Sequence, residues 1–139
     1  MQKIKSLKDL IESFKKENKL ALIFNGNELT YNDIYKDVLC FALKIHKKSK
    51  GKKLNIGIFS NDPYENIISM LACIYAGSIP MPIPNLNLIL RNQSLSKEFK
   101  IRLLIIGKTQ KKQIIENIEI IKFSLSSLSS KSIQNNMSS

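Results

Sequence analysis

Residues 71–84 read LACIYAGSIPMPIP, and this stretch decides the fold. It begins in an apolar helix, which Gly77 ends because glycine readily takes the positive φ found just after helices. Residues 79–83 then predict a strand in which Pro80 and Pro82 lack backbone donors. A strand with this composition either lies at the edge of a sheet, where the missing donors cost no ladder hydrogen bonds, or pairs only sparsely.

The helix that leads into this stretch has a clear start. Asp62 is a good N-cap, Pro63 suits the first helical position, and Glu65 lies where an acidic residue can complete a capping box. Residues 54–59 form an apolar run before it, as expected for a strand buried on both faces of a parallel sheet. We therefore predict a β-α-β unit over residues 54–83.

The N-terminal part predicts a helix and a hairpin. Residues 6–18 have the apolar stripe of an amphipathic helix, and residues 20–30 read as two short strands around an Asn-Gly turn. Thr30 then predicts an N-cap, with Asp33 three positions on. The long helix that it starts ends in the lysine-rich string 46–53, which suits the negative pole of the helix dipole.

The second half of the chain continues the alternation of strand and helix. The pattern predicts helices over residues 88–100 and 109–116, and strands over residues 102–106 and 118–123. Three successive β-α-β crossovers follow from residue 54 onward, so we predict an α/β fold with a Rossmann-like layered sheet. Residues 1–123 form one domain in this interpretation, and the serine-rich residues 124–139 form a disordered tail.

The net charge of +11 suggests nucleic-acid binding, but the composition argues against specific recognition. All but Arg91 and Arg102 of the 22 basic residues are lysine, whereas phosphate forks and base edges favour arginine. We expect only weak, salt-sensitive adhesion to polyanions, through residues 46–53 and 108–112.

The cysteines and the histidine of this chain give little support for a metal site or for redox chemistry. Cys40 and Cys73 have no CxxC spacing, so we expect two buried, unpaired thiols in a reducing compartment. His46 is the single histidine, which supports neither a zinc site nor a catalytic triad. No apolar run approaches the roughly 20 residues that span a bilayer, and the N-terminus lacks the apolar core of a secretion signal. These features predict a cytoplasmic location.

Taken in order, these motifs resemble the opening of the AMP-dependent synthetase/ligase superfamily, the adenylate-forming or AMP-binding enzymes. The resemblance is closest to acyl-CoA synthetases and fatty acyl-AMP ligases. In that superfamily, a hairpin with an LTY-x-E/D-L sequence precedes a long helix; a buried strand, an N-x-P-E helix start and an A-G-x-hydrophobic-x-P strand follow. The matching residues are 21–24, Gly26, Leu29, Thr30, Tyr31, Asp33 and Ile34, then 56–59, Asn61, Pro63 and Glu65, and finally Tyr75, Ala76, Gly77, Ile79, Pro80 and Pro82.

The resemblance implies an enzyme that uses ATP and Mg²⁺ to convert a carboxylate, such as a fatty acid, to an acyl adenylate. The acyl group would then pass to coenzyme A or to a carrier protein. The resemblance also implies that the phosphate loop, the acidic residue for the ATP ribose and the catalytic lysine come later in such an enzyme than the part matched here.

The glycines and serines of this chain support that last expectation. Its five glycines form neither GxGxxG nor GxxxxGK, and the serine run at residues 124–130 has no glycine for a phosphate-binding turn. We therefore expect no catalytic, cofactor-binding or metal residues in this chain. We also expect that it holds neither ATP nor Mg²⁺ and is catalytically incomplete on its own.

Two hypotheses follow. The first is an N-terminal fragment of an adenylating ligase, truncated or split, whose partner is the remainder of the enzyme. The second is a non-catalytic α/β interaction module that docks on a partner ligase or carrier protein, because a parallel sheet cut at this point leaves an open edge and apolar surface. The sequence does not distinguish between acyl substrates, thiol acceptors or oligomeric states.

Overall fold

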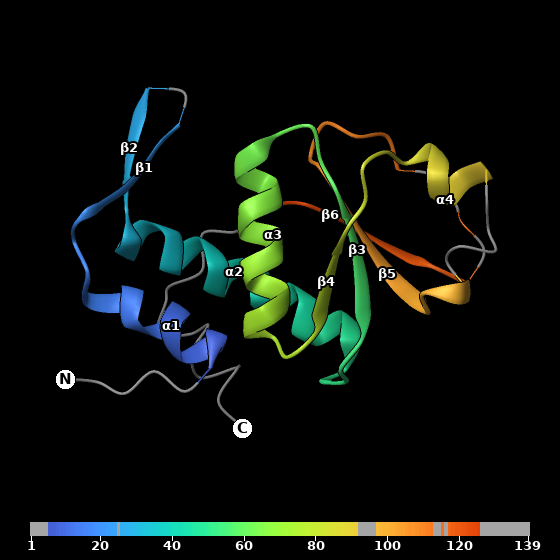
Figure 1. The fold of residues 1–139 in the computed structure, drawn as a ribbon, viewed down its shortest axis with the longest axis horizontal. Helices are drawn as coiled ribbons and strands as arrows, with labels where there is room; N and C mark the ends of the chain where they lie inside the picture. The colour runs from blue at the N-terminus through green and yellow to red at the C-terminus, as the bar shows by residue number, and fades with distance from the viewer. Residues whose placement is uncertain (1–5, 25, 92–96, 113–114, 116, 126–139) are drawn as a thin grey trace.

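A four-stranded parallel sheet forms the centre of the fold (Figure 1). The computed structural model describes residues 6–24, 26–91, 97–112, 115 and 117–125. The strand order is β4-β3-β5-β6, and each neighbouring pair is parallel. The strands are β3 (Asn55–Phe59), β4 (Ile79–Pro82), β5 (Ile101–Ile106) and β6 (Glu119–Lys122). This arrangement confirms the predicted α/β fold with a layered parallel sheet.

Helices cover both faces of this sheet; they are α2 (Tyr31–Ser49), α3 (Pro63–Tyr75) and α4 (Asn87–Arg91). Successive side chains of a strand point to opposite faces, so the apolar strands supply two separate cores. α2 and α3 pack on one face, in a cluster that includes Ile58 and Ile105. On the other face, Ile89 of α4 joins Leu104 and Ile106.

The predicted helix signals are found in the structure. The Thr30 hydroxyl accepts from Asp33 N at 3.1 Å, and the Asp33 carboxylate accepts from Thr30 N at 2.9 Å, which completes the capping box of α2. Asp62 caps α3 by accepting from Tyr64 N at 2.9 Å. Gly77 follows α3 with a φ of 85°, as expected for the residue after a helix.

The prolines of β4 lie at the free edge of the sheet. Ile79 N donates to Leu54 O at 2.8 Å, and Ile83 N donates to Ile58 O at 2.9 Å. Since alternate residues of a strand direct their backbone groups to opposite sides, the nitrogens of Pro80 and Pro82 point outward. The prediction of an edge strand is therefore confirmed, because β4 pairs with β3 alone in the described sheet.

The N-terminal elements lie beside α2 and α3 (Figure 1). They are α1 (Leu7–Ser13), the short 3-10 helix η1 (Phe14–Lys16), β1 (Leu20–Phe24) and β2 (Asn27–Thr30). β1 and β2 form the predicted antiparallel hairpin as a separate two-stranded sheet. The first helix is shorter than the predicted 6–18, since its α-helical part ends at Ser13.

The predicted helix over residues 109–116 was wrong for the residues that the structure describes there. Gln110 N donates to Gly107 O at 3.0 Å in a turn, and residues 111–112 have no regular structure. Ile115 instead forms an isolated antiparallel bridge with Ile118. Both isoleucines are buried in the α4-side cluster, so packing against the sheet overrides the helical pattern.

The predicted helix over residues 88–100 is present in two pieces among the described residues. α4 covers its start, residues 97–98 are helical, and Lys100 has a left-handed φ of 54° before β5. The segment between these pieces and the predicted tail from residue 126 onward lie outside the described residues.

Candidate functional site

The strand order reverses beside β3, where β4 lies on one side and β5 on the other. Parallel α/β sheets bind their ligands in the crevice outside the carboxyl ends of the strands at such a switch point. In this chain the two carboxyl ends are Phe59 and Ile106. The residues that follow them, 60–66 and 107–108, are therefore the first candidates for a site.

A buried carboxylate occupies this position. Glu65 is only 3% exposed, although it is charged and lies in the first turn of α3. Its Oε1 accepts from the Ser60 hydroxyl at 2.7 Å and from Lys108 N at 3.2 Å. Glu65 thus joins the ends of β3 and β5 to the start of α3.

Gly107 allows this close contact. A Cβ at this residue would lie 2.5 Å from Ser60 Oγ and 2.7 Å from Glu65 Oε1, well inside normal van der Waals distance. Because only a glycine fits without displacing the two side chains, Ser60, Glu65 and Gly107 fill the space directly between the ends of β3 and β5.

The amino end of α3 is also occupied by protein groups. Asp62 Oδ1 accepts from Tyr64 N at 2.9 Å and from Glu65 N at 3.4 Å, the donors that could otherwise bind an anion. Ser60 Oγ accepts from Asp62 N at 3.0 Å, and Ser60 O accepts from Asn66 Nδ2 at 2.8 Å. These contacts make Ser60, Asp62, Glu65 and Asn66 a structural cluster at the helix start.

Sequence reasoning missed the role of Glu65. The pattern assigned it to a capping box, but Ser60 takes the reciprocal contact with Asp62 N and Glu65 reaches across to the end of β5. The available signal was positional: Ser60 and Gly107 each follow directly after one of two apolar strands. In a parallel sheet, residues in that position meet at one edge.

A second polar contact joins α2 to α3. The Tyr64 hydroxyl donates to Asp37 Oδ2. Desolvation raises the pKa of Asp37; the hydrogen bond from Tyr64 opposes this shift, and the nearby Asp33 charge adds to it. Burial and the same hydrogen bond raise the pKa of Tyr64, so this hydroxyl stays protonated and holds the two helices together.

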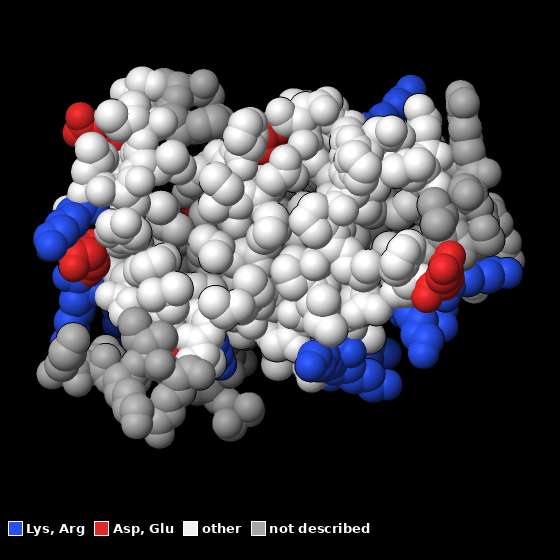
Figure 2. Space-filling view, in the orientation of Figure 1, with Lys and Arg blue, Asp and Glu red and all other residues white. Residues whose placement is uncertain are grey.

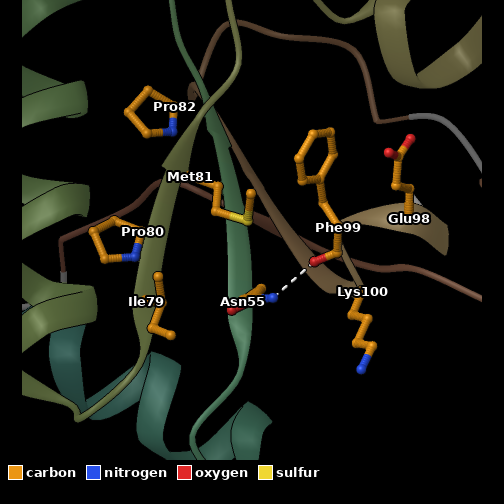
Figure 3. Close-up of a pocket in the computed structure, with 8 residues that line it drawn as sticks. All are labelled: Asn55, Ile79, Pro80, Met81, Pro82, Glu98, Phe99 and Lys100. Atoms are coloured by element: carbon orange, nitrogen blue, oxygen red, sulfur yellow. Dashed lines mark hydrogen bonds between the residues drawn. The ribbon is translucent and has the colours of Figure 1, made fainter. Parts of the chain in front are cut away.

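A shallow groove of about 590 Å³ runs beside β4 on the α4 side of the sheet (Figure 3). Its lining residues are Asn55, Ile79, Pro80, Met81, Pro82, Glu98, Phe99 and Lys100. Asn55 Nδ2 donates to Phe99 O at 2.7 Å, while Lys100 points away from the Phe99 ring (Figure 3). Small-molecule sites usually combine an apolar lining with polar groups that converge on the ligand. The lining of this groove lacks that convergence.

The remaining candidate residues lie apart from these features. Cys40 and Cys73 are buried and form no disulfide, as predicted, and burial raises the pKa of Cys73 to about 12. His46 is half-buried in the last turn of α2. Across the described ranges, no three His, Cys, Asp or Glu side chains gather closely enough to hold a metal ion. The same ranges contain no helix long and apolar enough to cross a membrane.

Two lysines in the second half of α2 contact other protein groups. Lys48 Nζ forms an ion pair with Glu119 Oε1 at 2.9 Å, with both side chains 52% exposed, so its contribution to stability is small. Lys44 Nζ donates to Ser124 O at 2.9 Å. In the orientation of Figure 1, lysines gather mainly along the margin of the molecule (Figure 2).

Comparison with solved structures shows the same fold in adenylating enzymes. The N-terminal subdomain of Klebsiella oxytoca NpsA, in complex with 3-hydroxybenzoyl-AMSN, matches with a TM-score of 0.70 and 16% identity over 97% of this chain and 32% of its own. The O-succinylbenzoate coenzyme A synthetase MenE from Bacillus subtilis, in complex with ATP and magnesium ion, matches with a TM-score of 0.69 and 13% identity. That match covers 93% of this chain and 33% of MenE.

An artificially fused adenylation–PCP di-domain from Klebsiella oxytoca, NpsA-ThdA, matches with a TM-score of 0.70 and 18% identity over 98% of this chain and 25% of the fusion. The chain therefore spans a third or less of the length of these structures. No curated protein matches it. The family described as AMP-binding enzyme matches residues 12–136. The chain belongs to the AMP-binding enzyme family.

Proposed function

We propose that this chain is the N-terminal scaffold of an AMP-dependent ligase. The complete enzyme would activate a fatty acid or another carboxylic acid with ATP and Mg²⁺ to form an acyl adenylate. It would then transfer the acyl group to coenzyme A or to a carrier protein. Family membership supports the reaction class.

The single observation that carries this proposal is the filled switch point. Glu65, Ser60 and Gly107 occupy the crevice in which a doubly wound sheet would bind a ligand. The described residues therefore serve as framework. In our proposal, the groups that bind ATP, Mg²⁺ and the carboxylate belong to the remainder of the enzyme, and this chain contributes no catalytic, cofactor-binding or metal residue.

The partner in this proposal is that remainder, and the site of action is the cytoplasm. The alternative is a non-catalytic module that docks on a ligase or a carrier protein. The NpsA-ThdA structure is an adenylation domain fused to a carrier domain, so the family fold is compatible with a neighbouring carrier protein.

An ATP–pyrophosphate exchange assay tests the proposal. The purified chain is incubated with ATP, Mg²⁺, labelled pyrophosphate and a panel of carboxylic acids that includes fatty and aromatic acids. We expect no carboxylate-dependent exchange, because in our proposal the groups that hold ATP belong to the remainder of the enzyme. Isothermal titration with Mg·ATP should likewise give no saturable heat.

A destabilised variant controls for contaminating ligases. Leu39→Asp places a charge in the buried core, so it should abolish any activity of the chain itself while leaving a contaminant untouched. Exchange by the wild-type chain that disappears in Leu39→Asp would overturn the scaffold proposal. Exchange that is equal in both preparations would identify a contaminant.

A further inference from the structure

Basic side chains from two distant parts of the sequence gather at the amino end of the central sheet. They belong to the connection between α2 and β3 and to the start of β5, and all are on exposed residues: Lys50, Lys52, Lys53, Lys100 and Arg102. These five residues form what we term the amino-end patch. Figure 2 shows basic side chains along the lower margin of the molecule, below the place where β3 begins in Figure 1.

Two hydrogen bonds tie the parts of the patch to the sheet. Asn55 Nδ2 donates to Phe99 O at 2.7 Å, which joins the start of β3 to the segment that precedes β5. Leu54 N donates to Ser78 Oγ at 3.2 Å, which holds the α2–β3 connection against the segment that precedes β4. The amino-end patch is therefore part of the fold and not a loose basic tail.

Acidic groups do little to neutralise the patch. Glu98 points away from Lys100 (Figure 3). Glu119, at the start of β6, pairs at 2.9 Å with Lys48, which lies outside the patch. Within the described part of the chain, the five patch residues take part in no salt bridge. The patch therefore presents uncompensated positive charge, most of it on lysine.

We propose that the amino-end patch docks on an anionic membrane surface. Lysine is a compact, hydrated charge on a flexible stem, so it needs no fixed partner geometry and suits mobile lipid headgroups. Cytoplasmic leaflets carry anionic lipids that attract clusters of lysine in this way. Ile79 begins β4 at the same end of the sheet and is 43% exposed, so it adds an apolar side chain that can enter the membrane interface.

A nucleic acid fits this patch less well. Phosphate forks and base edges favour arginine, and Arg102 is the only arginine of the patch. Single strands also bind through aromatic side chains on which bases stack. Phe99, next to Lys100 in the chain, directs its ring into the groove beside β4 and away from the patch (Figure 3).

The second basic string, residues 108–112, provides a matched control. The sequence predicted polyanion contacts for both strings, but the fold separates them, because residues 108–112 follow the carboxyl end of β5. The six residues of β5 put about 20 Å between the two ends of the strand. Lys111 and Lys112 are exposed, as Lys52 and Lys53 are in the patch.

Cosedimentation of the full chain with vesicles tests the proposal, with phosphatidylcholine alone and with equal parts of phosphatidylcholine and phosphatidylglycerol. We expect binding to the anionic vesicles only, weakening as salt screens the lysines. Each lysine near an anionic surface strengthens binding by about fivefold, so Lys52→Gln/Lys53→Gln should weaken it by about 25-fold. Lys111→Gln/Lys112→Gln removes the same net charge beyond the Debye length of about 8 Å, so it should weaken binding by less than about threefold.

Three outcomes would overturn the proposal. Equal losses in the two double variants would mean that net charge alone explains the binding. A chain that stays in solution with anionic vesicles at low salt would have no membrane-docking patch. A single-stranded RNA of mixed sequence that displaces the chain from the vesicles, at an equal concentration of phosphate groups, would identify a nucleic acid as the partner; retention on the vesicles supports the membrane. None of these results bears on the ligase scaffold, which the exchange assay tests separately.

Discussion

Gly107→Ala is the most direct test of the filled switch point. A methyl group at residue 107 would lie 2.5 Å from Ser60 Oγ and 2.7 Å from Glu65 Oε1. The backbone of Gly107 does not have the positive φ found at Gly26, Gly51 and Gly77, so the effect of the substitution is steric. Ser60 and Glu65 must separate, and the 2.7 Å hydrogen bond between them is strained or lost.

Two contributions set the loss of unfolding free energy that we expect for Gly107→Ala. Overpacking a well-filled site costs about 1–3 kcal/mol. A hydrogen bond to a charged group contributes about 1.5–3 kcal/mol, and Glu65 is too buried for water to replace it fully. Since the two terms overlap when the side chains relax, we expect Gly107→Ala to lower the free energy of unfolding by about 2–4 kcal/mol.

A double-mutant cycle with Ser60→Ala isolates the contact. Removing the hydroxyl deletes the nearest clashing atom, so the double variant should lose about 1 kcal/mol less than the sum of the single variants. The assay is urea denaturation followed by far-UV circular dichroism, with all four proteins at one concentration. Gly107→Ala within about 0.5 kcal/mol of wild type would refute the filled-crevice reasoning. Additive single effects would also refute it.

Three further predictions concern other parts of the chain. Because the pKa of Asp37 is raised on folding, the folded state holds the Asp37 proton more tightly than the unfolded state does. The stabilisation that this proton gives the folded state is complete below pH 3.8 and is lost as the pH rises through the raised pKa. Asp37→Asn should remove this loss, seen as a difference between urea-unfolding profiles across pH; parallel profiles would contradict it. Gly57→Ala should cost about 1–3 kcal/mol, because its Cβ would lie 2.6 Å from Ile83 Cδ1, and Ile83→Val should recover part of that cost in the same denaturation assay. Cys73, with a pKa of about 12, should not react with an aromatic disulfide reagent at pH 8 until urea unfolds the chain. Rapid reaction of both Cys40 and Cys73 in the native state would contradict the finding that the two thiols are buried.

Signals that act over a few residues predicted the fold well. The capping box at Thr30 and the Asp62-Pro63 start were sufficient to predict where α2 and α3 begin, because both depend on hydrogen bonds within one turn. The prolines of β4 predicted its edge position for a similar reason, since a missing donor excludes a central strand whatever the tertiary context.

Features that depend on distant contacts could not be predicted in this way. The pattern at residues 109–116 looked helical, yet Ile115 and Ile118 are buried against the sheet as part of a connection. The Glu65 cluster joins Ser60 to residues more than forty positions away, and it becomes visible only when β3 and β5 lie side by side. The predicted absence of catalytic and cofactor residues stays a prediction.

The free edge of β4, which carries prolines, limits the side on which a further strand can pair with the sheet. With Pro80 and Pro82 facing outward, an incoming strand finds carbonyls but no amide hydrogens there. β6, at the opposite border, pairs only with β5 in the described sheet and contains no proline. Head-to-tail stacking into fibres needs two receptive borders, so the β4 border disfavours such stacking through the four-stranded sheet, and a further strand pairs more readily with β6.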